Sequence, residues 1–182
     1  LEYLRRVATH GVEVRHEGSV SRVRAKPHQS AAQHQEEARR KIWDDVVKGR
    51  AWAAPSSHPG LEGIMESPQG RVPKMRPDRT IADEGRFIND MRDASEGCDK
   101  LNHPPAKLPT HREIARTIMW WRCRCPKVRI YLAKRDFQAA FKLLWVELPG
   151  LRIMAVSLQG LGGAEPTTVL YLTMVFGWTG AP

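Results

Sequence analysis

Two apolar segments in the second half of the chain constrain its fold most. From Val128 the apolar residues occupy every second position up to Asp136, which is the period of a half-buried β-strand. The segment from Thr167 to Phe176 predicts a second, buried strand, and the residues between Phe137 and Val146 predict a helical turn. A turn follows the second strand. With the helices described next, this pattern predicts an α+β fold.

Two helices are expected upstream of these strands. The first spans Gln33 to Lys48, with Gly49 as its stop signal. Its expected apolar stripe consists of Ile42, Trp43, Val46 and Val47. The second begins at Thr110, where a glutamate three residues on completes a capping box, and Pro126 closes it. Its expected apolar face consists of Ile114, Ile118 and Trp121.

The chain divides into three regions by composition. Residues 1–58 form a polar N-terminal extension with one helix, and residues 54–60 are rich in proline and serine and predict a linker. Residues 59–126 contain short extended pieces broken by turns at 67–70 and 76–79, with a strand opening at 86–88. Residues 127–182 contain the two apolar strands.

The charge distribution favours a polyanionic partner. The formal net charge is +9, and the sequence pI is near 9.9. Ten lysines and arginines against two acidic residues lie between Lys107 and Lys142, interleaved with tryptophan and tyrosine. We expect nucleic-acid contacts from Arg122, Arg124 and Arg129 in this stretch. The alternative is a solvated helix face followed by an edge strand.

The number of cysteines and the hydropathy indicate the cellular compartment of the protein. Three cysteines, an odd number, form no disulfide framework and favour a reducing compartment. No apolar run approaches the length of about 18 residues that a membrane span needs. We therefore expect an intracellular protein, cytoplasmic or nuclear and not secreted, with no membrane partner.

Asp136 is the clearest candidate in the sequence for a residue that takes part in chemistry. A carboxylate at the end of a strand stands at the rim of a sheet, where its oxygens can bind a hard divalent cation such as Mg²⁺. The alternative for a single aspartate at a strand end is a turn or cap residue.

Three sequence motifs resemble those of retroviral and retrotransposon reverse transcriptases. The segment Asp136-Phe137-Gln138-Ala139-Ala140-Phe141 resembles the first palm motif, and 171–182, which ends in Phe-Gly-Trp-Thr-Gly-Ala-Pro, resembles the second. Upstream, Ser67-Pro68, Val72-Pro73-Lys74 and the Arg-Phe-Ile-Asn-Asp-Met-Arg of 86–92 are similar to the fingers signature. The resemblance covers about residues 61–182, and the motifs occur in the order that the family has.

The resemblance implies an incomplete right-hand polymerase fold, with fingers in 59–126 and a partial palm in 127–182. It implies RNA-directed DNA polymerase chemistry with Mg²⁺ (or Mn²⁺), an RNA or DNA template with primer, and deoxynucleoside triphosphates. It also implies that the chain belongs to a larger polyprotein. The alternative is a non-enzymatic, basic nucleic-acid-binding domain.

The resemblance also assigns roles in the palm. Asp136 would be a catalytic carboxylate and metal ligand, and the backbone at Phe137 would touch the triphosphate. Phe141 would be the steric gate that excludes a 2′-hydroxyl. Phe176 and Gly177 would pack beside the nucleotide and the template base.

In the fingers, Arg86 would contact the triphosphate, and either Lys74 or Arg76 would be the second cation there. Asp90 and Arg92 would brace the loop and the template strand. The sequence departs from the family in one important respect, because no Tyr/Phe-x-Asp-Asp motif follows Asp136. Since two-metal chemistry needs carboxylates from both motifs, we expect no polymerase activity from this chain alone.

Overall fold

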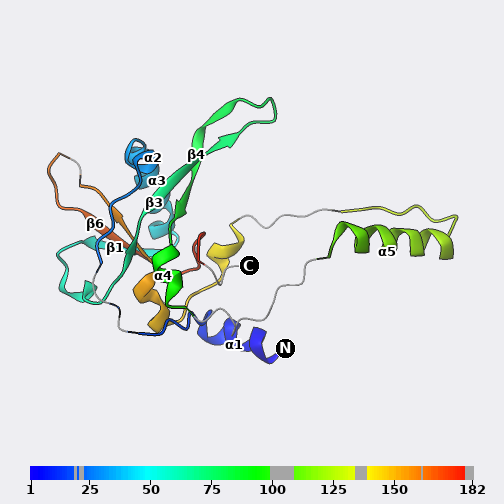
Figure 1. Ribbon diagram of the computed structural model, residues 1–182, viewed down its shortest axis with the longest axis horizontal. Coiled ribbons are helices and arrows are strands. Elements are labelled where there is room, and N and C mark those ends of the chain that lie inside the picture. The colour runs from blue at the N-terminus through cyan, green and yellow to red at the C-terminus, as the bar shows by residue number, and fades with distance from the viewer. Residues whose placement is uncertain (19, 21–22, 99–108, 134–138, 161, 179–182) are drawn as a thin grey trace.

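The computed structural model describes residues 1–18, 20, 23–98, 109–133, 139–160 and 162–178. Helices and strands are mixed along the chain, and the strands form one four-stranded sheet and one separate hairpin (Figure 1). The α-helices are α1 (Glu2–His10), α2 (Gln29–Ala32), α3 (Gln35–Val47), α4 (Arg92–Glu96) and α5 (His111–Arg124). The 3₁₀ helices are η1 (Pro59–Leu61), η2 (Ala140–Leu143) and η3 (Leu148–Ile153).

The four-stranded sheet joins residues from both ends of the chain. Its order is β1 (Ala51–Pro55), β6 (Thr167–Tyr171), β5 (Ala155–Leu158) and β2 (Glu66–Ser67). The β1–β6 and β6–β5 pairs are antiparallel, whereas β5 and β2 run parallel. β6 is central because its β-branched residues can pack on both faces of a buried strand. The expected strand at 167–176 is therefore confirmed, but it ends at Tyr171.

The hairpin of β3 (Gln69–Met75) and β4 (Ile81–Asn89) follows β2 directly. Only Pro68 separates β2 from β3, so the turn expected at 67–70 is wrong and the chain passes there from the sheet to the hairpin. The expected turn at 76–79 is confirmed: the Arg79 N–H donates to the Arg76 carbonyl, and the Arg76 N–H donates to the Thr80 carbonyl. The expected strand at 86–88 is confirmed as the second half of β4.

The N-terminal 58 residues take part in the same core as the rest of the chain. The sequence predicted one helix there, but the structure has α1, α2 and α3, of which α3 matches the prediction. The expected linker at 54–60 is wrong, because Ala54 and Pro55 lie in β1 and pair with β6. The most deeply buried core valines are Val14, Val156 and Val169. They come from three separate parts of the sequence, so the core is built from long-range contacts.

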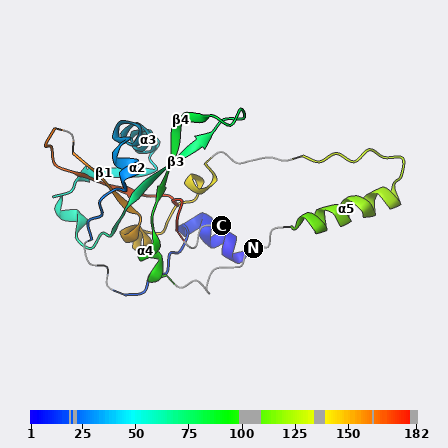
Figure 2. The same ribbon diagram turned by 45° about the horizontal axis from the view of Figure 1, so that its top comes forward.

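Helix α5 confirms the predicted capping box but not the predicted packing. The Glu113 N–H donates to the Thr110 side-chain oxygen, and the Glu113 carboxylate accepts from the Thr110 N–H at 2.7 Å. No residue of α5 is buried, and the helix lies well apart from the other described elements in both views (Figures 1 and 2). The strand expected at 128–136 is not formed in its described part, since residues 128–133 are irregular and exposed or half-buried.

No helix in the described ranges is both long and apolar enough to cross a membrane.

Candidate functional site

A cavity of about 410 Å³ lies between α3, the β3–β4 hairpin and the segment that follows β6. Helix α3 and the hairpin form two walls, and η2 and the end of β6 complete the lining. The lining residues with polar or aromatic side chains that matter here are Lys41, Asp45, Lys74, Arg86, Lys142, Tyr171 and Phe176. The cavity therefore brings together residues from two of the three motifs of the reverse-transcriptase resemblance, the fingers signature and the second palm motif.

Four basic side chains line this pocket, of which two form ion pairs with acids of α3. Lys41 is paired with Glu37 at 2.7 Å, and Lys142 is paired with Asp45, so α3 neutralises both lysines. The side chains of Lys74 and Arg86 have no hydrogen bond or ion pair with any residue that the structure describes. Two exposed cations beside a half-enclosed cavity have the charge that is needed to bind an anion.

Asp45 is a buried carboxylate in the wall of the pocket. Its side chain is 4% exposed, and besides Lys142 it has Arg50 within 4.0 Å. Tyr171 lines the same pocket and is buried. Burial, and to a lesser extent the negative charge of Asp45, raises the pKa of the Tyr171 phenol, so Tyr171 stays protonated at neutral pH.

Two aromatic rings expected at the nucleotide site are in contact. The rings of Phe141 and Phe176 meet edge to face, with their centroids 4.4 Å apart. Phe176 lines the cavity directly, and Phe141 packs behind it on the core. These two residues lie on η2 and on the segment after β6, so the structure brings the expected steric gate and the second palm motif together.

Gly177 follows Phe176 and lies against the end of β4. Its φ is +106°, and a Cβ built there would lie 2.0 Å from the Asn89 carbonyl oxygen. A glycine is therefore required by contact with the hairpin itself. Its expected contact with the nucleotide stays a prediction.

The structure distinguishes between the two candidates for the second fingers cation. Lys74 lines the cavity, whereas Arg76 lies at the turn of the hairpin and is paired with Asp83 at 2.9 Å. Arg76 is not among the residues that line the pocket. The geometry therefore favours Lys74.

Asp90 and Arg92 brace the chain after β4. The Asp90 carboxylate accepts two hydrogen bonds from Arg92, at 2.8 and 2.7 Å, and lies 3.1 Å from the His28 ring. The hydrogen bonds from Arg92 in particular hold the pKa of Asp90 well below its ordinary value. This contact agrees with a role in bracing the loop, and the expected contact with a template stays a prediction.

Asp136 and Phe137, the expected catalytic residue and its neighbour, lie outside the described residues. Among the described residues, no group of three or more histidine, cysteine, aspartate or glutamate side chains is placed to hold a metal ion. The Mg²⁺ site expected at Asp136 therefore stays a prediction.

The expected nucleic-acid-binding arginines are not at the pocket. Arg122 and Arg124 lie on α5, and Arg129 lies in the exposed segment after it. The Arg124 guanidinium stands over the Trp120 ring at 5.3 Å, and Trp120 packs edge to face with Trp121. α5 thus carries an exposed surface of arginine and tryptophan side chains.

Sequence reasoning missed the acidic side of α3. It assigned an apolar stripe that includes Trp43 and Val47, but these are 66% and 68% exposed. The buried residues of the helix are Ala38, Ile42 and Asp45. An acid three residues after a core isoleucine lies on the same face of a helix, and this spacing was the signal that could have identified Asp45.

No model of a known protein family matches the chain, and no curated protein matches it.

Proposed function

We propose that the cavity between α3 and the hairpin is the deoxynucleoside triphosphate site of an RNA-directed DNA polymerase of the reverse transcriptase type. The observation that carries this proposal is the meeting of Lys74, Arg86 and Phe176 around one pocket. Lys74 and Arg86 belong to the fingers signature and Phe176 to the second palm motif, and the side chains of the two cations have no partner among the described residues.

The pocket has the chemistry that a nucleoside triphosphate needs. The Arg86 guanidinium can form paired hydrogen bonds to phosphate oxygens, and Lys74 adds a second positive charge. The Phe141–Phe176 ring pair offers an apolar, rigid surface for the sugar and base. In the proposed site, a Mg²⁺ (or Mn²⁺) ion held by Asp136 would help to neutralise the triphosphate and activate the primer hydroxyl. Template and primer are the proposed partners.

Binding of nucleotides to the full chain tests this proposal. We expect saturable binding of dATP and weaker binding of ATP, because the Phe141 ring would exclude the 2′-hydroxyl. In Phe141→Ala the ratio of the two dissociation constants should fall by about tenfold. Isothermal titration of both nucleotides into wild type and variant measures this ratio.

Trp145 provides the matched control for the loss of an aromatic side chain. It precedes the buried Val146 and is 55% exposed. Unlike Phe141, it has no ring contact with the pocket-lining Phe176 among the described residues. Trp145→Ala should leave the ratio of dATP to ATP affinity unchanged. Absence of dATP binding in wild type would contradict the proposed function.

A second candidate function is non-enzymatic binding of nucleic acid through α5. The arginine and tryptophan surface of this helix favours it, since stacked aromatic rings and cations are the two elements of a single-strand platform.

The salt dependence of binding to a single-stranded oligonucleotide tests this second function. Replacing Arg122, Arg124 and Arg129 with glutamine should weaken binding and reduce the slope of log affinity against log salt by about 2. dATP binding at the pocket should not change in this variant. An unchanged slope would show that α5 makes no contact with the phosphate backbone.

A further inference from the structure

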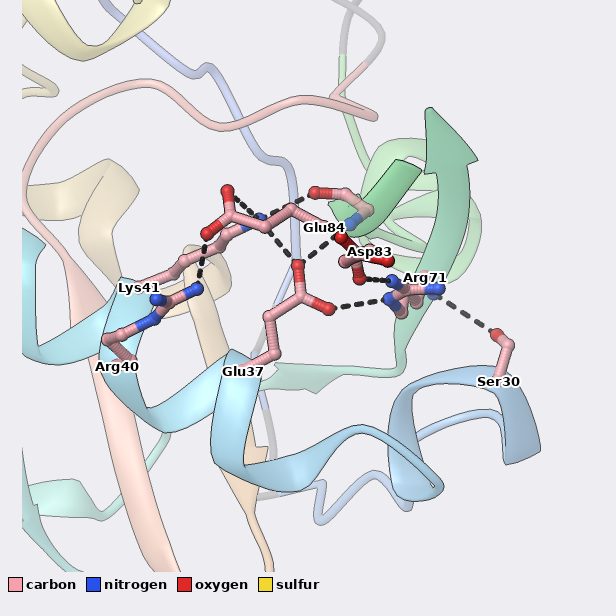
Figure 3. Close-up of polar contacts among 8 residues, drawn as sticks. Ser30, Glu37, Arg40, Lys41, Arg71, Asp83 and Glu84 are labelled. Atoms are coloured by element: carbon pink, nitrogen blue, oxygen red, sulfur yellow. Dashed lines mark hydrogen bonds and ion pairs between the residues drawn. The ribbon is translucent and has the colours of Figure 1, made fainter. Parts of the chain in front are cut away.

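Glu37 of α3 lies outside the region of the resemblance, yet it is the centre of a polar network on the hairpin (Figure 3). One of its carboxylate oxygens accepts from Lys41 at 2.7 Å and from the Gly85 N–H at 2.8 Å. The other accepts from the Arg71 Nε at 2.7 Å. The Glu37 side chain is only 11% exposed, so these three donors replace the water that it loses on burial.

The network contacts both strands of the hairpin at one point. Lys41 also donates to the Gly85 carbonyl at 2.6 Å, so both backbone groups of Gly85 are bonded to α3. The Arg71 side chain crosses Gly85 so closely that a Cβ there would lie 2.6 Å from the Arg71 Nε. Arg71 is 7% exposed and also donates to the Asp83 carbonyl at 2.7 Å. Glu37 therefore fixes α3, β3 and β4 relative to one another.

Glu37 itself does not line the pocket, but two of its three partners do. Lys41 and Gly85 are lining residues, and Arg86, whose guanidinium has no partner among the described residues, is joined to Gly85 by a peptide bond. A shift of the Gly85 backbone would therefore move Arg86 directly. Glu37 can act on a bound anion only through these residues.

Glu37 is negatively charged at neutral pH. Burial alone would raise the pKa of its carboxyl, but hydrogen bonds from Lys41, Arg71 and the Gly85 N–H outweigh burial and lower this pKa to about 2. Because the pKa is lowered on folding, the stabilisation is complete above the ordinary value of 4.5 and is lost as the pH falls from there toward 2. The network is therefore intact throughout the pH range in which nucleotides are bound.

We propose that Glu37 is the positioning residue of the triphosphate pocket, holding the Gly85–Arg86 backbone so that the Arg86 guanidinium faces the bound phosphates. This inference rests on the proposed function. It assigns to the N-terminal segment, which the resemblance does not cover, a direct part in building the pocket.

A double-mutant cycle on the full chain tests the proposal. We expect Glu37→Gln to weaken dATP binding about tenfold at a temperature where every variant is folded. In the Arg86→Gln background the same change should cost no further affinity, because Glu37 acts through Arg86. Titration calorimetry with dATP gives the four dissociation constants, and circular dichroism confirms the folded state.

Glu36→Gln is the matched control, since Glu36 precedes Glu37 on α3 and is exposed. It should leave dATP affinity unchanged. If Glu37→Gln does not fold, Arg71→Lys replaces it in the cycle, because a lysine lacks the planar guanidinium that joins the Glu37 carboxylate to the Asp83 carbonyl.

The outcomes separate the inference from the function on which it rests. If wild type binds dATP and the affinity losses of Glu37→Gln and Arg86→Gln are not additive, the result supports both the proposed function and the positioning role of Glu37. Wild-type binding with independent, additive losses shows that Glu37 contributes only general stability, and this overturns the inference alone. A wild-type chain that binds no dATP overturns the proposed function and the positioning role together.

Discussion

Gly177→Ala should lower the free energy of unfolding by about 3 kcal/mol or more, the largest stability effect that we expect from a single methyl group. Gly177 has a φ of +106°, which an alanine adopts only under strain. The added Cβ would also lie 2.0 Å from the Asn89 carbonyl oxygen. That atom belongs to the backbone at the end of β4, so it cannot move aside without shifting the hairpin. Denaturant unfolding followed by circular dichroism measures the loss.

Gly49→Ala separates the two causes of this loss. Gly49 also has a positive φ, +68°, but nothing lies within 4 Å of the position that its Cβ would take. Gly49→Ala should therefore lower the free energy of unfolding by only about 1 kcal/mol, which is the strain of an alanine in the left-handed conformation. Equal losses in the two variants would contradict the close approach of Gly177 to β4. Because Asn89 lines the pocket, Gly177→Ala should also weaken dATP binding.

The double substitution Arg86→Gln with Lys74→Gln should weaken dATP binding by about 100-fold. Each cation is expected to contribute a charge-assisted hydrogen bond worth about 1.5 kcal/mol or more to the triphosphate, and together these amount to two orders of magnitude. Neither side chain has an ion pair to lose among the described residues. Folding stability should therefore change little, and the loss should be confined to affinity.

Arg76→Gln with Arg79→Gln is the matched control. It removes the same number of positive charges from the same hairpin, but from its turn, where Arg76 is paired with Asp83. Long-range attraction alone predicts a change of no more than about threefold in this control. Similar losses in the two double variants would show that the hairpin attracts nucleotides only through its net charge.

The sequence predicted the elements whose determinants are local. The capping box at Thr110 and the turn at 76–79 depend on residues within four positions of one another, and the structure confirms both. The strand expected from Val128 had the right alternation, but a strand forms only beside another strand. In the described residues 128–133 no such partner is present, and the prediction is wrong there.

The candidate site could be predicted only in part for the same reason. The resemblance named Arg86, Phe176 and either Lys74 or Arg76, and in the structure Arg86, Phe176 and Lys74 line one cavity. It could not identify Glu37 or Asp45, because the partners of these acids lie 34 and 97 residues away in Arg71 and Lys142. The spacing of Asp45 from Ile42 indicates only that this acid lies on the buried face of α3. Which basic residue each acid pairs with depends on how α3 packs on the hairpin and on η2.

The proposed triphosphate pocket can be tested most directly by nuclear magnetic resonance of the arginine side chains during a dATP titration. We predict that the Nε–H resonance of Arg86 shifts and saturates together with the calorimetric binding curve, while that of Arg76 stays unchanged. This result would place the triphosphate in the cavity between α3 and the hairpin. Saturable dATP binding with Arg76 shifted and Arg86 unmoved would contradict the account, because the nucleotide would then be held at the turn of the hairpin.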